Sequence, residues 1–157
     1  MKRRINIVCV FLLFSPITGC VLGGTHGGIK SYEYPLKKDS VKEAIFKVIR
    51  SNQHIILDSD SDYYNDADRY ISFKVKTPDI YNDYTLHFRG NEQYWDTATT
   101  TIITLVYAFG KDGRGGSRGD GGVSWYTPFL KNRLIRCFEN ELVERVDSIL
   151  QIDRVTQ

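Results

Sequence analysis

The acidic stretch that begins at Asp58 is the first place where closely spaced side chains could do chemistry. Asp58, Asp60 and Asp62 stand two residues apart, and hard cations such as Ca²⁺ prefer clustered carboxylate oxygens. In a calcium-binding EF-hand loop, this spacing is followed by glycine at position 6 and glutamate at position 12. Those positions hold Tyr63 and Arg69. The stretch therefore predicts a solvated acidic loop, with the three aspartates as weak metal candidates, and we expect no cofactor.

The histidines and the C-terminal cysteine do not combine into a catalytic set. His26, His54 and His87 fall at spacings that match no zinc-binding motif. A Cys–His nucleophile pair would need Cys137, which lies seven residues after Leu130 on an apolar stripe and is predicted to be a buried thiol. The sequence thus favours a non-enzymatic protein. The alternative is a hydrolase or ligand-binding domain that uses the acidic stretch.

Aromatic side chains at loops and element ends carry the main binding hypothesis. Tyrosine and tryptophan are frequent anchors of protein interfaces. Six of them lie in loops or at the ends of predicted elements: Tyr63, Tyr64, Tyr94, Trp95, Trp125 and Tyr126. They could equally cap the edges of the core, since large aromatic side chains are seldom fully buried or fully exposed. Their exposure in a structure separates the two alternatives.

The N-terminus carries a different kind of chemistry, which centres on Cys20. Residues 1–14 combine a basic start with an apolar run of about ten residues, which suits a signal peptide and is too short to span a membrane. Residues 17–20 read Ile-Thr-Gly-Cys and resemble the lipobox of bacterial lipoproteins. The resemblance implies cleavage before Cys20 and acylation of its thiol and its new amino group. At about 0.8 kcal/mol per buried CH₂, two or three acyl chains give stable anchoring.

The competing interpretation is a plain secretory signal, with Cys20 in a disulfide to Cys9 or Cys137. Val21 and Leu22 follow Cys20, where an aspartate would retain an enterobacterial lipoprotein at the inner membrane. The resemblance therefore implies a location in the cell envelope, at the outer membrane and facing the periplasm. The lipid bilayer is then a partner through the acylated cysteine.

Removal of residues 1–19 changes the charge balance of the protein. The whole chain has 21 Lys and Arg against 19 Asp and Glu, a net charge of +2. Because Lys2, Arg3 and Arg4 are removed, the mature chain has 18 basic and 19 acidic side chains, a net charge of −1. We therefore expect no nucleic-acid binding, which normally needs a basic surface and a high pI.

A tether and one domain account for the mature chain. The glycine-rich residues 20–31 are predicted to be a flexible tether that spans roughly 20 Å, and residues 32–157 a single domain. An apolar stripe at helical spacing predicts a helix that starts at Ser40, where Glu43 completes a capping box, and ends near Asn52.

Strands and a second helix are predicted after this first helix. Alternating apolar residues indicate four strands, at 54–58, 70–76, 84–89 and 99–109. On the last of these, one face is expected to carry Ile103, Leu105, Tyr107 and Phe109. The glycine-rich residues 110–122 are predicted to be a mobile connector. A long helix follows over 127–150, with an inward stripe of Leu130, Leu134, Phe138, Leu142, Val146 and Ile149.

The links between these strands are too short for parallel crossovers. The fold class predicted is α+β, a two-layer sandwich of a mainly antiparallel four-stranded sheet and two helices, in the order α-β-β-β-β-α. The polar face of the sheet is expected to stay open to solvent or a partner. Together these features predict a membrane-anchored lipoprotein that binds a protein partner or assists envelope assembly. The alternative role is an immunity-type lipoprotein that neutralises a periplasmic toxin.

Overall fold

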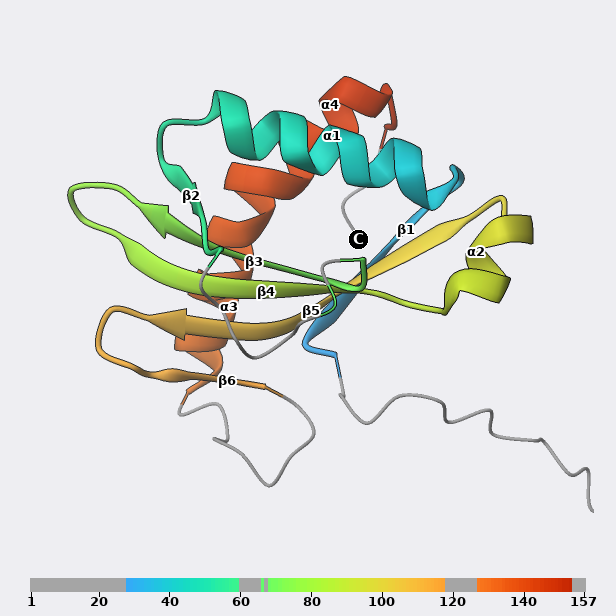
Figure 1. Cartoon of the computed structure of the whole chain (residues 1–157). Helices are drawn as coiled ribbons and strands as arrows, with labels where there is room; N and C mark the ends of the chain where they lie inside the picture. Colours follow the sequence, from blue (N-terminus) through green and yellow to red (C-terminus); the bar gives the residue numbers. More distant parts are fainter. Residues whose placement is uncertain (1–27, 60–65, 67, 118–126, 154–157) are drawn as a thin grey trace, which may run out of the picture.

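The computed structural model describes residues 28–59, 66, 68–117 and 127–153. It has an α+β fold in which helices cover one face of an antiparallel sheet (Figure 1). The strands are β1 (Lys30–Tyr34), β2 (Ile55–Leu57), β3 (Tyr70–Lys76), β4 (Tyr81–Phe88), β5 (Thr101–Gly110) and β6 (Gly115–Ser117). The helices are α1 (Lys38–Ser51), α2 (Glu92–Thr97), α3 (Pro128–Phe138), the π-helix η1 (Glu139–Val143) and α4 (Glu144–Leu150).

The sheet is wider than the four strands predicted from sequence. Its order is β1-β5-β4-β3-β2, and β6 pairs with β5 beyond the point where β1 ends, so that the described part of the sheet has six strands. The α+β class and the antiparallel pairing are confirmed. The four-stranded sheet and the simple order of elements are wrong, because β1 precedes α1, α2 separates β4 from β5, and β6 follows β5.

The two missed strands carry little sequence signal. Only Tyr32 and Tyr34 of β1 are buried, which is too few for a period to be recognised, and Lys30 and Ser31 belong to this strand rather than to the tether. Strand β6 reads Gly-Gly-Ser and forms because the turn after Gly110 folds it back onto β5. A β-carbon on Gly115 would overlap the carbonyl oxygen of Ala108, so this close approach requires glycine.

Helix α1 begins two residues earlier than its capping pattern predicts. Lys37 is the N-cap residue and makes no side-chain cap bond, so the predicted capping box at Ser40 and Glu43 is wrong. Lys38 begins the first turn, and its side chain is buried with the ammonium 3.3 Å from the centre of the Trp95 ring. The predicted end is confirmed, because Asn52 is the C-cap residue. The predicted stripe is buried throughout: Val41, Ala44, Ile45, Val48 and Ile49.

The predicted C-terminal helix is interrupted by a π-helical turn. Thr127 caps α3, because its hydroxyl oxygen accepts a hydrogen bond of 3.1 Å from the backbone N–H of Leu130. The wider turn of η1 places both Leu142 and Val143 in the core. Val146 is buried as predicted, but beyond it Leu150 packs against the core and Ile149, predicted to be buried, is exposed.

A β-bulge changes which side chains of β5 face the core. Thr85 pairs with Tyr107 and Leu86 pairs with Leu105, so Val106 is an extra residue on β5. The alternation reverses beyond it, and Ala108 faces the core in place of Tyr107 and Phe109. The prediction that these two aromatic residues share a face with Ile103 and Leu105 is therefore wrong.

Phe138 ties the helical layer to the sheet. Its ring lies 5.7 Å from Tyr32 of β1, 6.2 Å from Phe73 of β3 and 5.5 Å from Tyr84 of β4, measured between ring centres. Offset aromatic contacts at these distances stabilise a core beyond the area that they bury. No described helix covers the opposite face of the sheet (Figure 1). Among the described helices, none has the length and apolar character that a bilayer span would need.

Candidate functional site

Of the three candidate aspartates in the predicted acidic loop, the structure describes Asp58. Its carboxylate forms an ion pair of 3.1 Å with the ammonium of Lys74, on the adjacent strand β3. Asp60 and Asp62 lie outside the described residues. Within the described part of the chain, no three His, Cys, Asp or Glu side chains gather closely enough to hold a metal ion.

Two of the six candidate binding aromatics are described, and they play different roles on α2. Tyr94 is 44% exposed. Trp95 is half-buried, because its indole N–H donates to the carbonyl of Arg89 at 3.0 Å and its ring covers the Lys38 ammonium. Burial lowers the pKa of Lys38. Trp95 therefore caps the edge of the core, whereas Tyr94 is available to a partner.

The remaining predicted residues lie outside the described ranges. These are Tyr63, Tyr64, Trp125 and Tyr126 among the aromatics, and Cys20 with its lipobox at the N-terminus.

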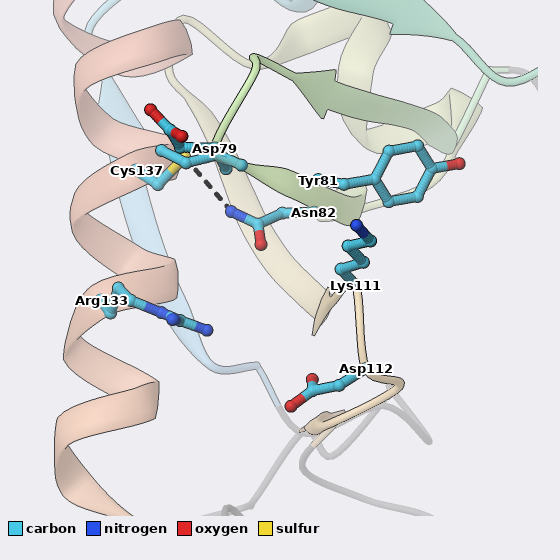
Figure 2. Close-up of a pocket in the computed structure, with 8 residues that line it drawn as sticks. Asp79, Tyr81, Asn82, Lys111, Asp112, Arg133 and Cys137 are labelled. Carbon is cyan, nitrogen blue, oxygen red and sulfur yellow. Dashed lines mark hydrogen bonds between the residues drawn. The ribbon is translucent and has the colours of Figure 1, made fainter.

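A pocket between α3 and the end of the sheet gathers residues that the sequence did not bring together. Its volume is about 430 Å³, within the range of small-molecule sites. Helix α3, the start of β4 and the two neighbouring turns form its walls (Figure 2). The lining residues are Asp79, Ile80, Tyr81, Asn82, Lys111, Asp112, Arg133 and Cys137.

Two cations reach this pocket from different elements. Arg133 points into it from α3, and Lys111 extends from the turn after β5 towards Asn82 (Figure 2). Neither forms an ion pair with any residue that the structure describes. The guanidinium lies beside Gly110, where an added β-carbon would be in ordinary van der Waals contact with Arg133 Nη2 at 3.5 Å. The two positive charges are therefore available to an anion.

Asn82 forms the wall opposite the Arg133 guanidinium and is held in one orientation. Its side-chain nitrogen donates to the Tyr84 hydroxyl at 3.1 Å and to Cys137 Sγ at 3.4 Å. The Tyr84 hydroxyl in turn donates to the carbonyl of Leu134 at 2.9 Å, so it can only accept from Asn82. Burial raises the pKa of Tyr84, which keeps this hydroxyl protonated. The amide oxygen of Asn82 therefore faces the cavity (Figure 2).

The acidic side chains contribute less to the interior of the pocket. The Asp79 carboxylate points away from the cavity (Figure 2). Asp112 lies at the lower rim, where its carboxylate is 3.6 Å from the guanidinium of Arg114 in an exposed ion pair. The Tyr81 ring also turns outward (Figure 2). The polar groups directed into the pocket are thus mainly the two cationic side chains, Arg133 and Lys111, and the amide oxygen of Asn82.

An exposed apolar side chain stands beside the pocket on α3. Phe129 precedes Arg133 by four residues, a spacing that places both on one flank of the helix. Phe129 is 78% exposed, and Ile80 at the pocket wall is 39% exposed. We call these residues, together with Lys111, the Arg133 surface. Cys137 lies one turn further along this flank and is half-buried at the pocket, so its predicted burial is only partial.

A serine motif near the pocket does not have the geometry of a nucleophile. Residues 115–119 spell Gly-x-Ser-x-Gly, a pattern that in hydrolases places the serine on a sharp turn between a strand and a helix. Ser117 instead belongs to β6, where it pairs with Tyr107 of β5. The described residues therefore provide no strand-to-helix elbow at this serine.

One sequence signal pointed to this surface. Phe129 is a large apolar residue outside the inward stripe of its helix, so the stripe predicts that its side chain is exposed. Comparison with known proteins found no matching family model, no similar curated protein and no similar solved structure.

Proposed function

We propose that this protein is a lipid-anchored, non-enzymatic module of the bacterial envelope that binds a protein partner. The anchor is the acylated Cys20, on the sequence pattern Ile-Thr-Gly-Cys, and the domain faces the periplasm from the outer membrane. The glycine-rich residues that follow Cys20 keep the domain within a short distance of the lipid surface.

The observation that carries the binding proposal is the Arg133 surface. Binding hot spots in protein interfaces are enriched in aromatic residues and arginine, and they lie beside pockets that a partner fills. Phe129 and Arg133 form such a pair on one flank of α3, next to a cavity with Ile80 in its wall. Burying the exposed Phe129 side chain against a partner would be favourable by about 2 kcal/mol.

Affinity purification from solubilised membranes tests the binding proposal. The full-length chain should recover a partner, and the Phe129→Asp variant should lose at least about 90% of it, because a charge replaces the apolar anchor. Lys47→Asp is the matched control, since Lys47 is exposed on α1, away from this surface. Equal recovery by the wild type and Phe129→Asp would contradict the proposal.

A separate experiment tests the anchor. Replacing Cys20 by serine removes the thiol that the lipobox supplies, so the Cys20→Ser variant should lose acyl labelling and leave the membrane fraction. Cys137→Ser is the control for a general loss of thiol chemistry and should remain membrane-bound. A Cys20→Ser chain that is still labelled and sedimented with membranes would refute lipidation at this residue.

A further inference from the structure

The charged residues around the pocket favour an anion with a single negative charge. Arg133 and Lys111 have no ion-pair partner among the described residues and approach one cavity from two elements. A carboxylate placed there would gain charge-assisted hydrogen bonds from both, and a planar guanidinium suits a carboxylate well. The carboxylate of Asp112 at the rim opposes the entry of a group with two negative charges.

The Asn82 amide oxygen adds a second requirement. It is an acceptor on a side chain that is only 5% exposed, and the bonds made by its nitrogen prevent the amide from rotating to present a donor. Sulfate has no hydrogen to offer this oxygen and would be repelled by it. A ligand that carries an N–H next to its carboxylate satisfies both the cations and this acceptor.

We propose that the pocket binds a carboxylate with an N–H on the neighbouring carbon, the chemistry shared by a free α-amino acid and the C-terminal residue of a polypeptide. Arg133 and Lys111 hold the carboxylate, Asn82 Oδ1 accepts from the N–H, and Ile80 contacts the adjoining side chain. The proposal rests on the proposed binding function and specifies what this site recognises in its ligand.

Nuclear magnetic resonance titration of the full-length chain in detergent micelles tests this proposal with defined probes. N-acetylglycine is the smallest molecule that carries both groups, and N-acetylglycinamide lacks only the carboxylate. N-acetylglycine should shift the resonances of Lys111 and the Arg133 side chain, and binding should weaken about tenfold or more for the amide. Acetate and inorganic phosphate, which lack the N–H, should bind more weakly than N-acetylglycine.

Matched variants test whether Arg133 and Lys111 are the cations that bind N-acetylglycine. Arg133→Gln should weaken N-acetylglycine binding about tenfold, whereas Arg136→Gln, an exposed arginine on α3 outside the pocket lining, should not. Lys111→Gln should also weaken binding, and Lys47→Gln on α1, an exposed lysine outside the pocket lining, is its control. Because Arg133 and Lys111 make no described ion pairs, both variants should unfold at the wild-type temperature.

Two further probes identify the natural source of the ligand. Tighter binding of N-acetyl-leucine than of leucine indicates a polypeptide C-terminus, and the reverse indicates a free amino acid. The proposal is overturned if the amide binds as well as the acid, if phosphate binds more tightly, or if Arg133→Gln binds like Arg136→Gln. These results would leave the protein-binding proposal standing if Phe129→Asp still abolished partner recovery, so the two failures are distinguishable.

Discussion

Replacing Tyr84 by phenylalanine should destabilise the fold and loosen the pocket wall. The hydroxyl donates to the Leu134 carbonyl at 2.9 Å and accepts from the Asn82 side chain at 3.1 Å, so it links β4 to α3 inside the core. Its removal deletes both hydrogen bonds, and it leaves the Leu134 carbonyl without this donor and a buried N–H of Asn82 without this acceptor. The expected cost in the free energy of unfolding is about 1–3 kcal/mol. At roughly 4 °C per kcal/mol for a domain of this size, Tm should fall by roughly 4–12 °C.

Urea denaturation and calorimetry of Tyr84→Phe measure this cost. Tyr81→Phe is the matched control on the same strand, because the Tyr81 ring turns away from the pocket (Figure 2); its effect should stay within about 0.5 kcal/mol. If Tyr84→Phe is as stable as Tyr81→Phe, the buried network does not hold Asn82, and the argument for an inward-facing amide oxygen fails with it.

The buried hydroxyl of Tyr84 predicts that the stability of the fold falls at alkaline pH. Burial raises the folded-state pKa of Tyr84 above the unfolded value of about 10. The stabilisation is therefore complete below pH 10 and is lost as pH rises further, since only the unfolded state releases the proton. The free-energy gap between the wild type and Tyr84→Phe should narrow by about 1.4 kcal/mol per pH unit above pH 10. A gap that stays constant from pH 8 to 11 would contradict the burial of this hydroxyl.

Three other substitutions test separate parts of the fold. Asp83 Oδ1 is shielded from solvent without a hydrogen-bond partner, and burial raises the pKa of this carboxyl. Asp83→Asn should therefore raise Tm at pH 7, with the gain disappearing below the unfolded pKa of about 3.9; equal gains at pH 3 and pH 7 would refute the charge argument. Gly115→Ala should destabilise the β5–β6 hairpin and speed amide exchange at Ala108, because the new β-carbon meets its carbonyl oxygen; unchanged exchange would contradict this strand pairing. Phe138→Ala should cost about 3–5 kcal/mol in urea denaturation, and a cost below about 1 kcal/mol would rule out its central packing position.

Strongly periodic segments could be predicted from the sequence. The buried stripe of α1 repeats over three turns, and β3 alternates Ile71, Phe73 and Val75 with polar residues over its whole length. In both cases burial on one face leaves a regular pattern. The α+β class follows from the order of such segments. The main sheet pairings follow from their short connections.

The features that escaped prediction depend on contacts distant in sequence. Strand β6 has no side chains that favour a strand and exists through pairing with β5. The bulge at Val106 redirects Tyr107 and Phe109 without any change in their apolar character. Lys38, the first residue of α1, is covered by Trp95 from far along the chain. The sequence pattern within each element gives no information about these distant contacts.

The candidate site also depends on contacts between residues that are distant in sequence. Asn82, Lys111 and Arg133 come from a strand, a turn and a helix, and no spacing rule connects them. Packing of α3 against β4 and the fold-back of the β5–β6 turn bring them to one cavity. Of the aromatic residues chosen from the sequence, the described pair lies on α2, whereas the exposed aromatic beside the pocket is Phe129.

Site-specific photocrosslinking in intact membranes tests most directly whether the Arg133 surface binds a protein. A benzophenone amino acid would replace Phe129 in the full-length chain and, in a second chain, the exposed Lys47 of α1. The account predicts a discrete crosslinked partner from position 129 that is lost when Arg133→Gln is added, and none from position 47. Equal labelling at both positions, or a partner crosslinked only from position 47, would contradict it.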